Sequence, residues 1–94
     1  MQFKFKPKFW KDIVRYKNDG EIMSAINKVF TNVEKANRID EINNIKELEK
    51  FNARYRIKLK LDKKRDFRIG VYIHGKTIWF ARFLHRQKIY DENW

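Results

Sequence analysis

Basic and proton-exchanging side chains gather at the end of the chain, directly after a long apolar run. The run Thr77 to Leu84 (TIWFARFL) leads into His85, Arg86, Gln87, Lys88 and Tyr90. Histidine exchanges protons near neutral pH, and arginine and lysine hold phosphate oxygens by charge-assisted hydrogen bonds. Such a group favours binding or cleavage of a polyanion, with His85 as the candidate acid or base.

More cations alternate with apolar residues in the two preceding segments, Tyr55 to Leu61 (YRIKLKL) and Phe67 to His74 (FRIGVYIH). Alternation with period two indicates strands that bury one face. The cations that fall on the other face are Arg56, Lys58, Lys60 and Arg68. We expect these side chains to share one sheet surface.

Composition narrows the class of protein. The chain has 94 residues, 23 Lys and Arg against 12 Asp and Glu, a net charge of +11 and no cysteine. One domain over residues 1–94 is expected, and the charge indicates a polyanionic partner such as nucleic acid or an acidic protein. With two histidines and no thiolate, neither a metal nor another cofactor is expected. Without an apolar leader or membrane-length run, a soluble cytoplasmic protein with no membrane partner is expected.

Helical and extended periodicities alternate along the chain and predict an α+β fold. Gln2 to Lys6 alternates as a short strand, and spacings of three and four then predict two helices packed as an antiparallel hairpin. The helices are expected from about Pro7 to Lys17 and from about Glu21 to Ala36, with Asp19 as the cap of the second. Asn37 to Asn52 is polar and is expected to form a loop or a short helical turn.

A three-stranded antiparallel sheet is predicted to follow, with the helices on one face and a short C-terminal segment after it. Gly75-Lys76 suits a type II′ turn, which sets His74 opposite Thr77. Continued without a break, this pairing brings Arg82 onto the apolar face as its one misfit and puts Phe83 opposite Arg68. A five-residue loop, Asp62 to Asp66, would set Leu61 opposite Phe67 and keep the apolar faces together.

The second face of this sheet combines cations with aromatic rings. Trp79 and Phe83 join Tyr72 there in the predicted pairing, and His85 comes next if the strand continues. Cations pair with phosphates and aromatic rings stack on unpaired bases at about 1–3 kcal/mol each. Exposed large aromatics need a partner, which could be a C-terminal segment folded back, another subunit or RNA.

The order of elements resembles the RelE/ParE superfamily of toxins from type II toxin–antitoxin systems. The segments that carry the likeness are YRIKL (55–59), DFRIGVYI (66–73), RFLHRQKIY (82–90) and the N-terminal FKPKFWKDI (5–13). The resemblance implies a RelE-like fold over nearly the whole chain. It also implies either a ribosome-dependent mRNA endoribonuclease that works by 2′-OH attack without a metal, or a ParE-like inhibitor of DNA gyrase.

Residue roles follow from the resemblance position by position. Arg56 and Lys58 match basic positions of the first sheet hairpin, and Arg68 matches a phosphate-facing arginine. The C-terminal proton-transfer and stacking group is matched by His85, Arg86 and Tyr90, whereas Leu84 stands where some nucleases have arginine. The expected catalytic residues are Arg56, Arg68, His85 and Tyr90; the expected RNA-binding residues are Lys58, Lys60, Tyr72, Trp79, Phe83 and Arg86.

The same likeness implies two kinds of partner: an acidic cognate antitoxin and the ribosome with its mRNA and rRNA. Three readings of function remain open from the sequence. An mRNA interferase that inhibits translation is favoured, and a gyrase inhibitor or a non-catalytic RNA-binding module are the alternatives.

Overall fold

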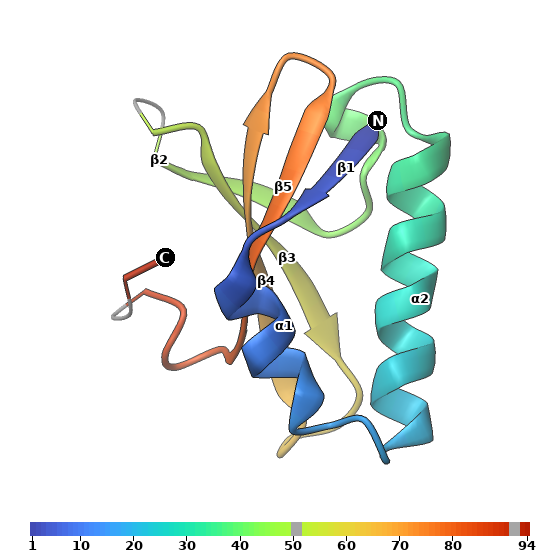
Figure 1. Cartoon of the computed structure of the whole chain (residues 1–94). Coiled ribbons are helices and arrows are strands. Elements are labelled where there is room, and N and C mark those ends of the chain that lie inside the picture. The colour runs from blue at the N-terminus through green and yellow to red at the C-terminus, as the bar shows by residue number, and fades with distance from the viewer. Residues whose placement is uncertain (50–51, 91–92) are drawn as a thin grey trace.

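Five strands and two α-helices build the protein in the computed structural model, which describes residues 1–49, 52–90, 93 and 94. The sheet is mixed, in the order β1-β5-β4-β3-β2, with β1 parallel to β5 and the other neighbours antiparallel (Figure 1). The elements in chain order are β1 (Gln2–Phe5), α1 (Pro7–Val14), α2 (Gly20–Lys35), a 3₁₀ turn (Ile39–Glu41), β2 (Ile45–Glu49), β3 (Arg54–Lys60), β4 (Asp66–His74) and β5 (Thr77–His85). The predicted α+β class is confirmed.

The two helices form the predicted hairpin and run in opposite directions (Figure 1). Pro7 stands in the first turn of α1, where its missing N–H is not needed. α1 ends at Val14, earlier than the expected Lys17. Asp19 caps α2 as predicted, its Oδ1 accepting hydrogen bonds from the backbone N–H groups of Glu21 and Ile22, both at 3.1 Å.

The polar stretch after α2 holds a strand that the sequence analysis missed. The expected short helical turn is present as the 3₁₀ turn Ile39–Glu41, but Ile45–Glu49 then pairs with β3 as the edge strand β2. The segment KELE carries three charges and no regular alternation of apolar residues. An edge strand with one solvent-facing side needs little apolar content, which explains why periodicity did not reveal it.

The β3–β4 hairpin has a loop of the predicted length, but the loop lies one residue earlier in the chain than predicted. Lys60 lies opposite Asp66 and Leu59 opposite Phe67, so the loop is Leu61–Arg65 and not Asp62–Asp66. A shift of two leaves every side chain on its predicted face. The facing pairs nevertheless change: Lys58 lies opposite Arg68 and Arg56 lies opposite Gly70.

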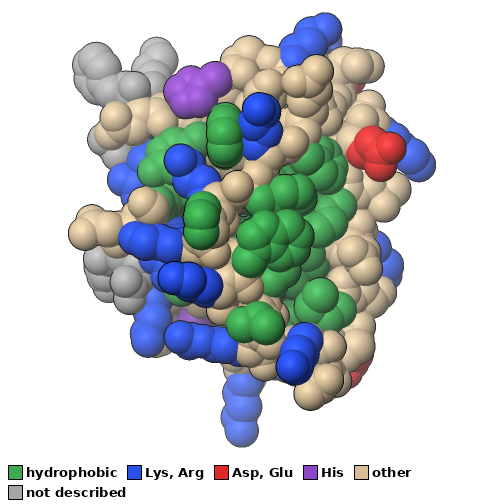
Figure 2. Space-filling model, viewed as in Figure 1, with side chains coloured by type: hydrophobic (Ala, Val, Ile, Leu, Met, Phe, Trp, Pro, Cys, Tyr) green, Lys and Arg blue, Asp and Glu red, His purple; other side chains and the backbone are tan. Residues whose placement is uncertain are grey.

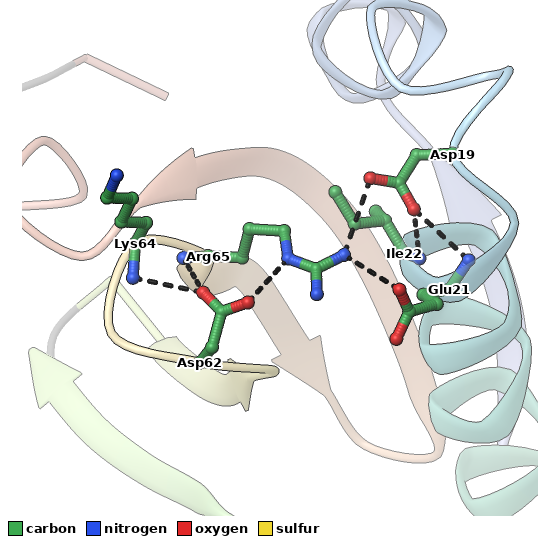
Figure 3. A network of polar contacts seen from close by, with 6 residues as sticks. All are labelled: Asp19, Glu21, Ile22, Asp62, Lys64 and Arg65. Carbon is green, nitrogen blue, oxygen red and sulfur yellow. Dashed lines mark hydrogen bonds and ion pairs between the residues drawn. The ribbon is translucent and has the colours of Figure 1, made fainter.

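Arg65 fixes this loop against the start of α2 (Figure 3). Its Nε donates to Asp62 Oδ2 at 2.8 Å, and its Nη1 lies 3.3 Å from Glu21 Oε1 and 3.6 Å from Asp19 Oδ2. The Arg65 backbone N–H also donates to Asp62 Oδ1 at 2.7 Å. The loop therefore closes on its own arginine, which joins sheet to helix.

A β-bulge in β5 overturns the predicted pairing of its second half. Val71 lies opposite Phe80 as predicted, but Gly70 lies opposite Arg82, so Ala81 is the additional residue. From Arg82 onward the faces are exchanged. Phe83 and His85, predicted on the second face, turn to the helix side, and Arg82 and Leu84 turn to the second face. The bulge removes the misfit: Arg82 leaves the core and Phe83, 2% exposed, replaces it.

The core lies between the helices and the helix-facing side of the sheet. Aromatic rings make up much of it: Phe80 packs against Phe3, Phe5, Phe9 and Phe30, and Phe83 stacks on Phe67 at 4.7 Å between centroids. No helix among the described residues is long and apolar enough to cross a membrane.

Candidate nucleic-acid interface

The second face of the sheet carries cations along its whole length. On β3 these are Arg54, Arg56, Lys58 and Lys60, and on β4 and β5 they are Arg68 and Arg82. Figure 2 shows Lys and Arg side chains gathered on the side of the molecule where the C-terminus lies, with few acidic groups in that view. Arg54 lies just outside the strand expected from the sequence, and its part in this face was missed.

One end of the face is a cluster of cations around a single carboxylate. Arg68 Nη1 donates to Asp66 Oδ1 at 2.6 Å and to the Phe67 carbonyl at 2.9 Å. Arg86 Nε lies 3.9 Å from Asp66 Oδ2, and Lys60 is paired opposite Asp66. Lys58 lies opposite Arg68. We call these five residues, Lys58, Lys60, Asp66, Arg68 and Arg86, the Asp66 cluster.

Asp66 is ionised at the centre of this cluster. Its burial raises the pKa of the carboxyl, but the hydrogen bond and charge of Arg68, with Lys60 and Arg86, outweigh burial and hold that pKa below its usual value. One negative charge thus faces four positive ones, and the cluster keeps an excess of positive charge. Asp66 was not among the site residues predicted from the sequence.

Arg68 is more buried than its predicted role suggested, with 8% of its surface exposed. Asp66 orients it, and its Nε has no hydrogen-bond partner among the described residues. Arg56 differs, since its Nη1 donates to the Asn44 carbonyl at 2.8 Å beside the start of β2. The predicted cationic site therefore has a buried, fixed member and a half-buried one.

The two candidate proton-transfer residues lie in different surroundings. His85 lies opposite Phe67, edge-on to its ring at 6.2 Å, and its Nδ1 accepts a long hydrogen bond (3.4 Å) from the Gln87 N–H. It is a sequence neighbour of the Asp66 cluster but points to the helix side. Tyr90 is 60% exposed. The neighbouring Ile89 carbonyl accepts a hydrogen bond from Trp94, which lies over the second face.

The other end of the face is an open hollow of about 660 Å³ lined by Lys6, Asn52, Arg54, Tyr72, His74 and Trp79. Tyr72 and Trp79 lie opposite each other, as predicted, and the Lys6 ammonium lies 5.4 and 5.2 Å from their ring centroids. The Lys4 ammonium lies 5.3 Å from the Trp79 ring. Cations over aromatic rings are attracted by the ring quadrupole, so the rings and charges hold each other in place.

Trp94 covers the middle of the face. A Cβ on Gly70 would stand 2.7–2.9 Å from three ring carbons of Trp94, which is closer than real contacts allow. The Arg54 guanidinium lies 4.2 Å from the indole centroid, and Tyr72 meets it edge-on at 5.4 Å. The sequence predicts a partner for the aromatic residues of this face, and a folded-back C-terminal segment is one candidate. Trp94 takes that role for Tyr72.

Comparison with known proteins gives a full-length match. No family model matches the chain. Toxin RelE3 of Methanocaldococcus jannaschii is 30% identical over 92 residues, which cover 97% of each chain. The chain belongs to the RelE toxin family. This agrees with the RelE/ParE resemblance seen in the sequence.

Solved structures give the same fold. The toxin–antitoxin complex of RelB and RelE from Methanococcus jannaschii contains a chain with TM-score 0.68 and 30% identity, over 94% of this chain and 95% of that one. YafQ from E. coli has TM-score 0.70 at 11% identity, over 95% and 97%. A YoeB–YefM complex from Staphylococcus aureus contains a chain with TM-score 0.66 at 14% identity, over 92% and 97%.

Among the described residues no group of three or more His, Asp or Glu side chains is arranged to hold a metal ion. The prediction that the site works without a metal or another cofactor stays a prediction.

Proposed function

We propose that this RelE-family protein is the toxin of a type II toxin–antitoxin system and cuts mRNA on the ribosome, which inhibits translation. The observation that carries the proposal is the Asp66 cluster, where the exposed cations Lys58, Lys60 and Arg86 surround the buried pair of Arg68 and Asp66. Such an excess of positive charge suits a phosphodiester, whose negative charge grows as it is cleaved. Membership of the RelE family supports the same reading.

The chemistry requires an attacking ribose oxygen and two proton transfers. The 2′-oxygen forms a bond to the adjacent phosphorus and the bond to the 5′-oxygen breaks, which leaves a 2′,3′-cyclic phosphate and a free 5′-hydroxyl. A base takes the 2′-OH proton and an acid gives one to the departing 5′-oxygen. Arg68 and Lys58 stabilise the charge on phosphorus in this scheme. Arg56 positions the RNA strand, and His85 or Tyr90 moves protons.

Exposure favours Tyr90 over His85 as the group that moves protons on a bound RNA. His85 turns to the side of Phe67, whereas Tyr90 is exposed beside the Ile89 carbonyl. We therefore expect Tyr90→Phe to lower the cleavage rate more than His85→Gln does. A general acid or base contributes about 10²–10⁴-fold, so a loss of that size should belong to Tyr90.

The partners of this function are the ribosome with mRNA and rRNA, and an acidic antitoxin, so the toxin would act in the cytoplasm. Two structurally similar proteins were solved as the complexes RelB–RelE and YoeB–YefM. A net charge of +11 suits both an RNA surface and an acidic protein. An antitoxin that covers the Asp66 cluster would neutralise the toxin by excluding RNA.

Purified protein added to a translating extract tests the proposal, with the 5′ ends of mRNA fragments mapped against ribosome position. Cuts within the ribosomal A site by wild type, lost in Tyr90→Phe, are expected. DNA gyrase supercoiling is assayed in parallel and should be unaffected. Inhibition of supercoiling without mRNA cuts would establish the gyrase alternative. RNA binding with a steep salt dependence but no cleavage would leave a non-catalytic module.

A further inference from the structure

Gly70 leaves a flat patch of backbone in the middle of the second face, which we call the seat. It lies on the central strand β4, opposite Arg56 on one side and Arg82 on the other. Without a side chain, the backbone there can be approached closely. Three adjacent ring carbons of Trp94 lie almost equally far from the missing Cβ position, at 2.7, 2.9 and 2.9 Å, as they do when a ring lies face-down.

The contacts around that indole are those that hold a nucleobase. The Arg54 guanidinium lies 4.2 Å from the ring centroid, and Tyr72 packs against it edge-on with an interplanar angle of 76°. In its plane, the indole Nε1–H donates to the Ile89 carbonyl at 3.3 Å. Proteins hold unpaired bases by stacking on aromatic rings or guanidinium planes, with hydrogen bonds at the edge of the base. All four nucleobases carry an N–H or amino donor that could replace the indole N–H.

We propose that the seat over Gly70 is a stacking site for an RNA base, and that Trp94 occupies it in the RNA-free protein. A base of a single strand displaces the indole, takes its place against Arg54 and Tyr72, and brings its phosphate towards Arg56. The proposal rests on the proposed function in taking RNA as the ligand of this face. It adds that the chain carries its own competitor for the substrate.

Removing the Trp94 side chain should strengthen RNA binding, which is the opposite of what the loss of an aromatic contact usually does. If the site is open in about one molecule in five, it binds about five times more weakly than a permanently open site does. Trp94→Ala should therefore bind a short single-stranded RNA about fivefold more tightly, although it removes an aromatic ring from an RNA-binding face. Trp10→Ala is the matched control, because Trp10 is an exposed tryptophan on α1, and it should bind as wild type does.

The decisive measurement is fluorescence anisotropy with two labelled eight-nucleotide strands at one fixed salt concentration. One strand carries all its bases, and the other has the same phosphates but abasic sugars in the middle. The gain of Trp94→Ala should appear with the first strand and vanish with the second. Adding Gly70→Ala to Trp94→Ala should abolish the gain, because the new methyl group fills the seat. Gly20→Ala is the matched control, because a Cβ added at Gly20 meets no atom within 4 Å, and it should leave the gain in binding intact.

Equal or weaker RNA binding by Trp94→Ala would overturn the proposal, as would an equal gain on the abasic strand or a gain that survives Gly70→Ala. Circular dichroism of each variant confirms folding before titration. Failure of this inference is separable from failure of the proposed function. If Trp94→Ala cuts mRNA normally but binds RNA no better than wild type, only the proposal that Trp94 competes with RNA is refuted. If the protein neither binds RNA nor cuts mRNA, the proposed function is refuted as well.

Discussion

Asp12 of α1 and Arg82 of β5 form a two-bonded ion pair at the point where β5 bulges. Arg82 Nε and Nη2 donate to the Asp12 carboxylate at 2.8 and 3.2 Å, and the Phe83 backbone N–H donates to the same carboxylate at 2.9 Å. Both side chains are close to nine-tenths buried. Arg82 Nη1 also donates to the Asn93 carbonyl. The Asp12 carboxylate thus joins α1 to the bulge, and Arg82 joins the bulge to Asn93.

Asp12→Ala is expected to destabilise the fold strongly. It leaves the Arg82 charge and the Phe83 N–H without their acceptor, and breaking a buried ion pair from one side costs about 3–5 kcal/mol. Thermal unfolding should shift down by well over 10 °C, since each kcal/mol corresponds to about 4–8 °C in a domain of this size.

Asp40→Ala is the matched control for that measurement, because Asp40 pairs with Arg38 on the surface. Its effect should stay within about 0.5 kcal/mol. Similar Tm values for the two variants would show that the Asp12 contact does not hold the bulge.

The bulge itself can be tested by comparing neighbours on β5. Phe83 is buried on Phe67, whereas Leu84 is only partly buried opposite Arg68. Phe83→Ala should cost about 3–5 kcal/mol in urea unfolding, and Leu84→Ala about 1 kcal/mol. A strand without the bulge would reverse this order, because Leu84 would then lie in the core.

The position of Arg82 shows how much of the fold could be predicted. Hydrophobic periodicity and turn residues predicted both helices, the strands β1, β3, β4 and β5, the Gly75 turn and the face of each sheet residue up to Phe80. The same rule, continued past Phe80, led to an arginine in the core. That conflict was a signal for a bulge, but it could not indicate where the extra residue lay. The location depends on Asp12, which is 70 positions away in sequence.

Acid should weaken the Asp66 cluster. The Asp66 carboxyl has a pKa held below its usual value of 3.8, so its contribution to stability is complete above that value and is lost as pH falls through the folded-state pKa. Asp66→Asn removes the charge at every pH. The free energy of unfolding of wild type should exceed that of the variant by about 2 kcal/mol near pH 6, the usual size for a hydrogen bond to a charged group.

The gap in stability between the two proteins should narrow as the pH falls below 3.8, because the unfolded chain then takes up a proton at Asp66 more readily than the folded protein does. The measurement is urea unfolding at half-unit pH steps. A gap between wild type and Asp66→Asn that stays constant down to pH 2.5 would contradict the lowered pKa.

The candidate site was predicted in its chemistry but only partly in its geometry. The cations of β3 and the ring pair of Tyr72 and Trp79 lie on the predicted face, because a shift of two residues preserves sides. Phe83 and His85 lie on the opposite face from the predicted one, because the additional residue of the bulge, Ala81, exchanges the two faces for every later residue of β5. Asp66 and Trp94 were missed altogether. Their roles arise from contacts with Arg68 and Gly70, which no local pattern specifies.

The central claim is that RNA is cleaved on the second face of the sheet. The most direct test compares two double Lys→Gln variants, one on this face and one on α2, and measures mRNA cleavage by each in a translating extract. Lys58→Gln with Lys60→Gln removes two exposed cations from the Asp66 cluster, and Lys28→Gln with Lys35→Gln removes two exposed cations from α2. Both variants have the same net charge. The first should cut at least about tenfold more slowly, because phosphate contacts on the site are lost, and the second should stay within about twofold of wild type. Equal rates for the two variants would contradict the assignment of RNA cleavage to this face.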